Sequence, residues 1–238
     1  MLFIKLFDTH RCIAHFLEFR DARLNIGYKL LTSFCNYKKK LLKANKIICC
    51  EYNRAHITKA LFQLKELPVI LPNKPFSQED GIDKEDIPPI VSTLKERYKN
   101  KKIILYQGAF QPERQLDHFF EAVDSLPDEY VFFLMGTDNE YKKALRKKYE
   151  NKRNIFLPFL PSPLHLHVTQ MAYIGVLTYI PLGKKLGQML NVLYCAPNKI
   201  YKYAKFGIPM ITNDLPALKF AFLENKAGIA VTDPLSVS

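Results

Sequence analysis

A glycine followed six residues later by an arginine marks one place in this chain where chemistry is expected. Gly108 follows the apolar run I-I-L-Y-Q, and the loop A-F-Q-P-E leads from it to Arg114. A glycine lets backbone amides approach a phosphate closely, and an arginine beside them can donate two charge-assisted hydrogen bonds. The pattern is typical of a diphosphate site. A glycine that ends a strand, followed by a solvated arginine, would give the same letters.

A second group of this kind consists of Pro197, Asn198 and Lys199. Proline suits the first turn of a helix and asparagine is a good N-cap, while the lysine adds a positive charge close to amide groups that attract anions. The group therefore predicts a further contribution to phosphate binding. The same three residues would also begin an ordinary capped helix that binds no phosphate.

These residues can bind one ligand only if the fold brings them to the same edge of a sheet. The second half of the chain has a regular alternation of predicted strands and helices, which builds such a sheet. Strands are expected at Lys102–Tyr106, Tyr130–Met135, Ile155–Leu157, Ala172–Thr178, Pro209–Thr212 and Gly228–Val231. Helices are expected at Arg114–Ser125, Asn139–Glu150, Pro163–Gln170, Pro197–Phe206 and Leu215–Leu223. Such an alternation builds an α/β fold with a doubly wound parallel sheet, whose carboxyl edge binds phosphorylated ligands.

The first part of the chain also alternates predicted strands and helices, and the composition changes after it. In order, we expect a strand at Leu2–Phe7, a mostly helical tract to Lys43, a strand at Lys46–Cys50 and a helix at Glu51–Leu64. Pro72–Pro89 is rich in proline and carboxylates and predicts an exposed connection, and Ile90–Lys99 predicts a helix. The predicted organisation is therefore a partial domain over residues 1–75, a linker with a helix over 76–100, and a second domain over 101–238.

The charge is unevenly distributed. The 238 residues carry a net charge of +12, and most of the excess lies in residues 1–75. A basic face attracts anionic lipid, nucleic acid or phosphorylated substrates alike. Lys38, Lys39, Lys40, Lys43 and Lys46 suit an anionic membrane surface. Nucleic acid is not expected as a partner, because aromatic residues are not interleaved with these lysines.

The cysteines and the apolar start bear on location. The five cysteines form no C-x-x-C pair, which suits a reducing compartment. The apolar start Met1–Phe7 is too short for a secretory core or a membrane span. A cytoplasmic protein, peripheral at the inner membrane at most, is the expectation.

Across the second half, the order and spacing of several motifs resemble a known family. They are I-L-Y-Q-G-A-F with Arg114 after it, F-L-M-G from Phe133, N-I-F-L-P-F from Asn154, A-Y-I-G-V-L-T-Y from Ala172, A-P-N-K-I-Y-K-Y-A-K-F-G-I-P from Ala196, T-N-D-L-P-A-L from Thr212 and A-G-I-A-V from Ala227. The chain resembles GT-B-fold glycosyltransferases of family 4, especially bacterial members of capsule and exopolysaccharide assembly. The resemblance implies a nearly complete Rossmann-like donor domain over residues 101–238, without its final helices.

The first third resembles the same family less closely, through D-T-H at Asp8, I-I-C-C-E-Y-N-R-A from Ile47 and P-V-I-L-P-N-K-P from Pro68. Residues 1–75 would then be the closing portion of an acceptor-side, Rossmann-like domain. This interpretation makes the chain truncated at both ends, and a second chain that supplies the missing N-terminal part is an expected partner.

The resemblance also implies roles for single residues. Gly108 and Arg114 would face the diphosphate of the donor, Asn198 and Lys199 would border the nucleotide pocket, and His10 would be the catalytic residue near the transferred sugar. The sequence departs from the family at Tyr194 and Lys202, which stand where the family has a glutamate pair for sugar and ribose hydroxyls. A lysine ammonium cannot accept a hydrogen bond from ribose.

The function that the resemblance implies is transfer of a hexose or N-acetylhexosamine from a nucleotide-diphosphate sugar to a glycan or lipid-linked acceptor. Retention of configuration, no cofactor and no metal are expected, with cell-surface polysaccharide as the product. Two alternatives stay open: a catalytically silent donor-domain remnant that binds a partner, and a nucleotide-sugar epimerase of the same architecture.

Overall fold

The computed structural model describes residues 11–18, 41–74, 87–182 and 186–232. The expected strand at Leu2–Phe7, the residue His10 and the run Lys38–Lys40 lie outside these ranges. The chain forms two compact units, one of residues 1–73, 181–197 and 215–218, and one of residues 74–180, 198–214 and 219–238. The domain boundaries expected from composition stay predictions.

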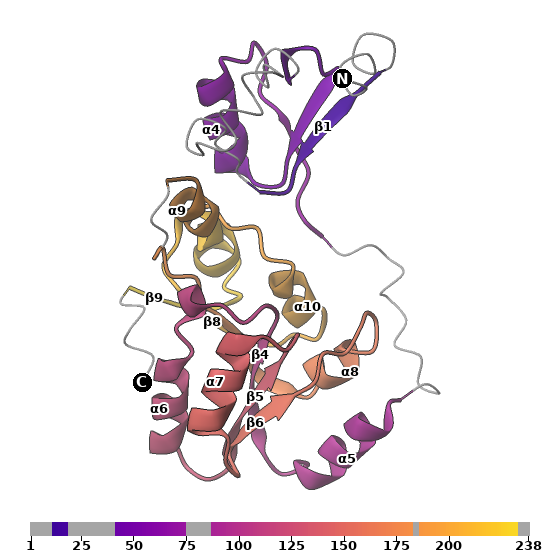
Figure 1. Ribbon diagram of the computed structural model, residues 1–238, viewed down its shortest axis with the longest axis vertical. Helices are drawn as coiled ribbons and strands as arrows, with labels where there is room; N and C mark the ends of the chain where they lie inside the picture. Colours follow the sequence, from indigo (N-terminus) through magenta and orange to yellow (C-terminus); the bar gives the residue numbers. More distant parts are fainter. Residues whose placement is uncertain (1–10, 19–40, 75–86, 183–185, 233–238) are drawn as a thin grey trace. The chain divides into compact units, whose positions relative to one another are not determined.

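The first unit contains a small parallel sheet. Among the described residues, its strands are β1 (Ile13–Phe16), β2 (Lys46–Cys49) and β3 (Val69–Ile70), paired in that order (Figure 1). The strand expected near Lys46 is confirmed. The helical tract expected before Lys43 is wrong at Ile13–Phe16, because these residues pair with β2 in parallel register. Pairing with a strand that is distant in the sequence decides the conformation there, and local propensity does not.

A buried arginine connects two helices of the first unit. Glu51 caps α4 (Tyr52–Phe62), since its carboxylate accepts a hydrogen bond from the amide of Arg54. The Arg54 guanidinium donates to the carbonyls of Asn191 and Tyr194, at the end of α9 (Leu186–Leu193). A cation at the carbonyl end of a helix is favourable. The sequence pattern had not predicted α9.

The second unit is built on a larger parallel sheet. Within the described residues its six strands lie in the order β6-β5-β4-β7-β8-β9. Their bounds are β4 (Lys102–Gln107), β5 (Tyr130–Met135), β6 (Asn154–Leu157), β7 (Ala172–Leu177), β8 (Met210–Asn213) and β9 (Gly228–Val231), which confirms the predicted strands. Because β4 neighbours β7, the chain direction across the sheet reverses between them. Ligands of open α/β sheets bind at such a switch point, outside the carboxyl ends of the strands.

Helical segments surround this sheet. They are α5 (Pro89–Arg97), the 3-10 turn η2 (Pro112–Arg114), α6 (Asp117–Ser125), α7 (Glu140–Tyr149), α8 (Leu166–Thr169), α10 (Lys199–Lys205) and the π-helical turn η4 (Phe220–Glu224). The helix expected at Leu215–Leu223 is instead the 3-10 turn Pro216–Leu218 followed by η4. Helices α6 and α7 cover β4 to β6 (Figure 1), and the core between them contains Tyr106, Phe120 and Phe132.

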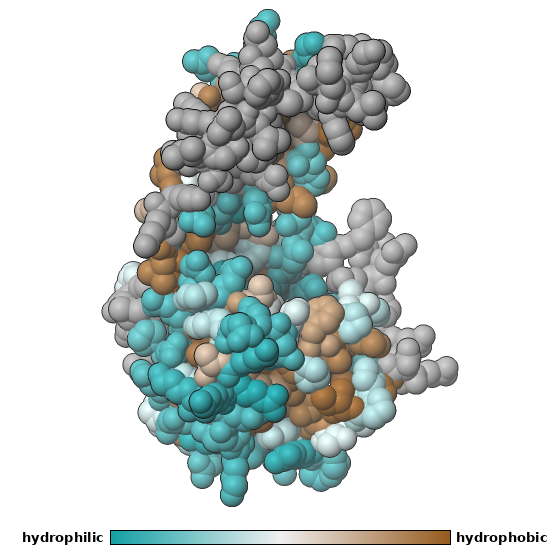
Figure 2. Space-filling view, in the orientation of Figure 1, coloured by the Kyte–Doolittle hydropathy of each residue, from teal (hydrophilic) through white to brown (hydrophobic). Residues whose placement is uncertain are grey.

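The polar face of α7 is turned to solvent. Leu145 and Lys142 are buried, whereas Lys143 and Arg146 are exposed, so the surface over α7 is hydrophilic (Figure 2). Among the described residues, no helix has the length and apolar character needed to cross a bilayer.

Candidate functional site

Gly108 lies at the end of β4, at the switch point of the larger sheet. Its φ of +132° disfavours any residue with a side chain. Its amide donates to the carbonyl of Met135, 2.9 Å away. A Cβ atom at this position would lie 3.3 Å from Cε of Lys199. Glycine is therefore needed both for the turn and for the close approach of the Lys199 side chain.

Lys199 lies against this glycine, and Arg114, which comes from a separate segment, shares the aromatic neighbour Tyr179 with it. Cζ of Arg114 lies 4.0 Å from the ring centre of Tyr179. Nζ of Lys199 lies 4.2 Å from the ring centre of Tyr106 and 5.5 Å from that of Tyr179. The structure thus brings together Gly108, Arg114 and Lys199, three of the residues predicted from the sequence. Paired cations at a sheet edge of this kind can bind an anion.

Hydrogen bonds fix Arg114 to the segment that follows β7. Its Nη1 donates to the carbonyl of Thr178 at 3.2 Å, and the Thr178 hydroxyl donates to the carbonyl of Arg114 at 2.7 Å. The amide of Ile180 donates to the carbonyl of Glu113 at 2.8 Å. Nε of Arg114 is buried and has no hydrogen-bond partner among the described residues. A buried donor of this kind favours an acceptor from a ligand.

Tyr106 stabilises the loop after β4. It is completely buried, and burial raises the pKa of its hydroxyl to about 12, although Arg114 nearby acts in the opposite direction. The hydroxyl is therefore protonated at neutral pH and donates to the carbonyl of Ala109. Tyr106 and Tyr179 were not identified as site residues from the sequence. The sequence feature that could have identified them is their position: Tyr106 ends one expected strand, and Tyr179 directly follows another.

The neighbouring loop after β5 supports the same turn. Asn139 caps α7, since its Oδ1 accepts from the amide of Lys142 at 2.8 Å. Its Nδ2 donates to the carbonyl of Phe110 at 2.7 Å. One side chain therefore caps a helix and also holds the loop that begins at Gly108.

Replacing Asn139 with alanine should lower the free energy of unfolding by about 1 kcal/mol, because the helix loses its cap. Asn139→Asp keeps a capping oxygen but lacks the donor to Phe110, so we expect a stability between those of Asn139→Ala and the wild type. Urea unfolding followed by circular dichroism measures both. Equal stability of Asn139→Ala and the wild type would contradict the role assigned to this cap.

The other predicted residues lie in different surroundings. Asn198 is the exposed N-cap residue of α10, but its side chain makes no capping hydrogen bond, contrary to the expectation. Nζ of Lys202 lies 2.7 Å from Nε2 of His165. Tyr194 belongs to the first unit, where its carbonyl accepts from Arg54. His10 lies outside the described residues. The roles assigned to these residues stay predictions.

A tyrosine of α10 explains how this helix is held on the sheet. Tyr203 is completely buried, and its hydroxyl donates to the carbonyl of Leu105 at 2.8 Å. A Cβ atom on Gly175 would lie 2.7 Å from the Tyr203 ring, so glycine on β7 makes room for the ring. The position of Lys199, at the start of the same helix, depends on this packing.

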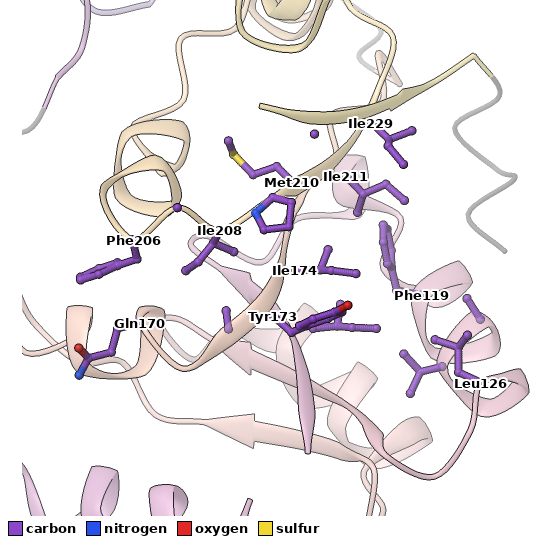
Figure 3. A pocket seen from close by; sticks show the side chains of 17 residues that line it. Phe119, Leu126, Gln170, Tyr173, Ile174, Phe206, Ile208, Met210, Ile211 and Ile229 are labelled. Carbon is purple, nitrogen blue, oxygen red and sulfur yellow. The ribbon is translucent and has the colours of Figure 1, made fainter. Parts of the chain in front are cut away.

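An apolar cavity of about 580 Å³ lies elsewhere in the second unit. Side chains from α6 and from the starts of β7, β8 and β9 line it, among them Phe119, Tyr173, Met210 and Ile229 (Figure 3). It is thus at the amino-terminal ends of the strands, away from Gly108. Its lining offers few polar groups, so the chemistry favours the switch point as the site for a phosphorylated ligand.

Comparisons with known proteins place this geometry in context. No protein-family model and no curated protein matches the sequence. Among solved structures, HepE of Anabaena in complex with UDP matches with a TM-score of 0.62 and 14% identity, over 89% of this chain and 56% of that chain. The chain has a GT-B-like fold. The predicted fold class, α/β with parallel Rossmann-like sheets, is therefore confirmed.

Two other solved structures with the GT-B fold are also similar to this chain. WaaG, a glycosyltransferase involved in lipopolysaccharide biosynthesis, matches with a TM-score of 0.60 and 16% identity, over 94% of this chain and 62% of that chain. An α,α-trehalose-phosphate synthase (UDP-forming) of Burkholderia vietnamiensis matches with a TM-score of 0.62 and 10% identity. The match covers 98% of this chain and 60% of that chain. The chain thus spans little more than half the length of these proteins.

Proposed function

We propose that this chain carries the donor-binding site of a glycosyltransferase that uses a nucleotide-diphosphate sugar. The observation that carries the proposal is the pair of cations, Arg114 and Lys199, beside Gly108 at the switch point between β4 and β7. HepE, which shares the fold, has been crystallised with UDP and with UDP-glucose. A nucleoside diphosphate is the ligand that best suits both the charge and the location.

In this proposal the protein acts mainly by binding and electrostatics. As the bond between the sugar and the diphosphate breaks, negative charge develops on the departing oxygen, and Arg114, Lys199 and the amides near Gly108 stabilise it. An acceptor hydroxyl held close to the sugar attacks from the same face, which retains configuration. The cations do the work that a metal ion would otherwise do, so no metal is included. Asn198 would border the nucleotide, and His10 would lie near the sugar.

The finer parts of the proposal concern the substrates and the location. The transferred group would be a hexose or N-acetylhexosamine, and the acceptor a glycan or a lipid-linked glycan of cell-surface polysaccharide biosynthesis. The basic residues of the first 75, including Lys43 and Lys46, would contact the anionic inner membrane from the cytoplasmic side. A second chain is a further proposed partner on the acceptor side.

A second candidate is a donor domain that binds a partner without catalysis. The observation in its favour is the position of Lys199, whose side chain packs directly over Gly108 and takes up space next to the loop. A diphosphate reaches the backbone of this loop once the flexible end of the side chain shifts slightly. A lysine that stays in place would leave the site closed.

Isothermal titration calorimetry of the whole chain with UDP, GDP and ADP tests the proposal. We expect saturable binding of at least one of the three, and weaker binding at high salt, because charge pairing dominates. Absence of heat with all three at millimolar concentration would reject the proposal. Binding without release of nucleotide from a nucleotide sugar, in the presence of acceptor glycans, would favour the silent binding domain.

A further inference from the structure

Tyr179 is the one residue whose ring contacts both cations of the candidate site, as far as the described residues extend. It lies two residues after the end of β7 and is 7% exposed. Its ring centre lies 4.0 Å from Cζ of Arg114 and 5.5 Å from Nζ of Lys199. Arg114 and Lys199 come from segments that are distant in the sequence, so a common neighbour is what relates their positions.

The backbone of Tyr179 is itself held from two sides. Asn213, at the end of β8, accepts from the amide of Tyr179 at 3.0 Å and donates to its carbonyl at 2.9 Å. On the other side, Thr178 and Ile180 form hydrogen bonds with Arg114 and Glu113 of the 3-10 turn η2. The ring is therefore presented by a segment that strands β7 and β8 fix in place.

The physical role of such a ring follows from the charges around it. Two cations close together repel each other, and the negative face of an aromatic ring offsets part of this cost. Cations that are already in place need little rearrangement when a dianionic group arrives, so binding loses less free energy to ordering. A ring that holds both cations thereby prepares the site for its ligand.

We propose that Tyr179 is a positioning residue for diphosphate binding: its ring holds Arg114 and Lys199 as a pair at the switch point. This inference rests on the proposed function. Tyr179 ends the motif A-Y-I-G-V-L-T-Y but received no role from the sequence, and the inference assigns its contribution to the aromatic ring.

Calorimetry with UDP and with uridine, on single variants of the whole chain, tests the inference. We expect Tyr179→Leu to weaken UDP binding about tenfold, the loss expected for cation–aromatic contacts, and to affect uridine less. Tyr179→Phe keeps the ring and should restore most of the UDP affinity. Thermal unfolding of each variant shows whether the fold is intact.

Tyr173 offers a matched control from β7, the strand that precedes Tyr179. It lies at the other end of β7 and also has a lysine over its ring, with Nζ of Lys102 at 5.4 Å from the ring centre. Tyr173→Leu should leave UDP binding unchanged. The inference is overturned if Tyr179→Leu binds UDP as the wild type does, if UDP and uridine lose affinity equally, or if Tyr179→Phe is as weak as Tyr179→Leu.

A measurement on the free protein separates this inference from the proposed function. The Nε–H signal of Arg114 in a ¹⁵N spectrum, identified by its loss in Arg114→Lys, should show a ring-current shift in the wild type and in Tyr179→Phe but not in Tyr179→Leu. If the wild type binds no nucleoside diphosphate, the proposed function fails, whereas this shift still reports whether the ring holds Arg114. An unchanged shift in Tyr179→Leu would refute the positioning role itself.

Discussion

Arg114→Ala is expected to weaken binding of UDP by about 1.5 to 3 kcal/mol, or roughly 10- to 150-fold, the value of a hydrogen bond to a charged group. The guanidinium lies against Tyr179 and has a buried Nε without a hydrogen-bond partner among the described residues. Alanine removes the charge and this donor together. Calorimetry at low and moderate salt measures the loss, and the salt dependence of the remaining affinity should be smaller.

Two variants control this experiment. Arg114→Lys keeps the charge but lacks the planar guanidinium that can donate two hydrogen bonds to a phosphate. Its affinity for UDP should therefore lie between those of the wild type and Arg114→Ala. Arg146 lies on the exposed face of α7 and pairs with Glu150, and Arg146→Ala should bind UDP as the wild type does. Unchanged affinity in Arg114→Ala, with binding intact in the wild type, would mean that the diphosphate binds elsewhere.

Much of the larger sheet could be predicted because its strands are local patterns. Short apolar runs such as Tyr130–Met135, separated by helices, indicate buried parallel strands without any knowledge of their partners. Gly108 and Arg114 could be predicted for a related reason. Residues just after a strand in such a sheet reach its carboxyl edge whatever the details of packing.

What the sequence did not predict depends on partners that are distant in the chain. Ile13–Phe16 is a strand because β2 pairs with it, and α9 is held at its carboxyl end by Arg54, which precedes it by more than a hundred residues. Tyr179 gains its role only when η2 and α10 are in place around it. Its place after the expected strand Ala172–Thr178 was the one local signal, since Tyr173 lies near the start of that strand and is exposed at the opposite edge.

Lys142 is the residue whose surroundings the sequence predicts least well, since it belongs to the basic run of α7 and yet is buried. Its side chain is 4% exposed, and its ammonium donates to the carbonyls of Gly136 and Leu157, each at 2.7 Å. It thereby connects the carboxyl ends of β5 and β6, next to the loop that Gly108 begins. In the sequence it cannot be told apart from Lys143, its exposed neighbour.

Asp138 completes this arrangement from the solvent side. Its carboxylate lies 2.7 Å from the Lys142 ammonium, and that hydrogen bond is the main reason that its pKa is lowered. A carboxyl group with a lowered pKa in the folded state stabilises the protein above its ordinary pKa. That contribution is lost as the pH falls through the folded-state value. Removing the Lys142 ammonium should therefore raise the pKa of Asp138 toward its ordinary value, which NMR titration of the carboxyl carbon can follow.

Lys142→Met should lower the free energy of unfolding by about 2 to 4 kcal/mol, because methionine fills the space of the lysine stem but leaves two buried carbonyls without their donor. Lys143→Met is the matched control: the side chain is 66% exposed, and the change should stay within about 0.5 kcal/mol. Urea unfolding measures both. Since the carbonyl of Gly136 adjoins the Gly108 turn, Lys142→Met should also weaken UDP binding in the folded protein. Equal stability of the two variants would show that the buried ammonium does not hold the ends of β5 and β6 together.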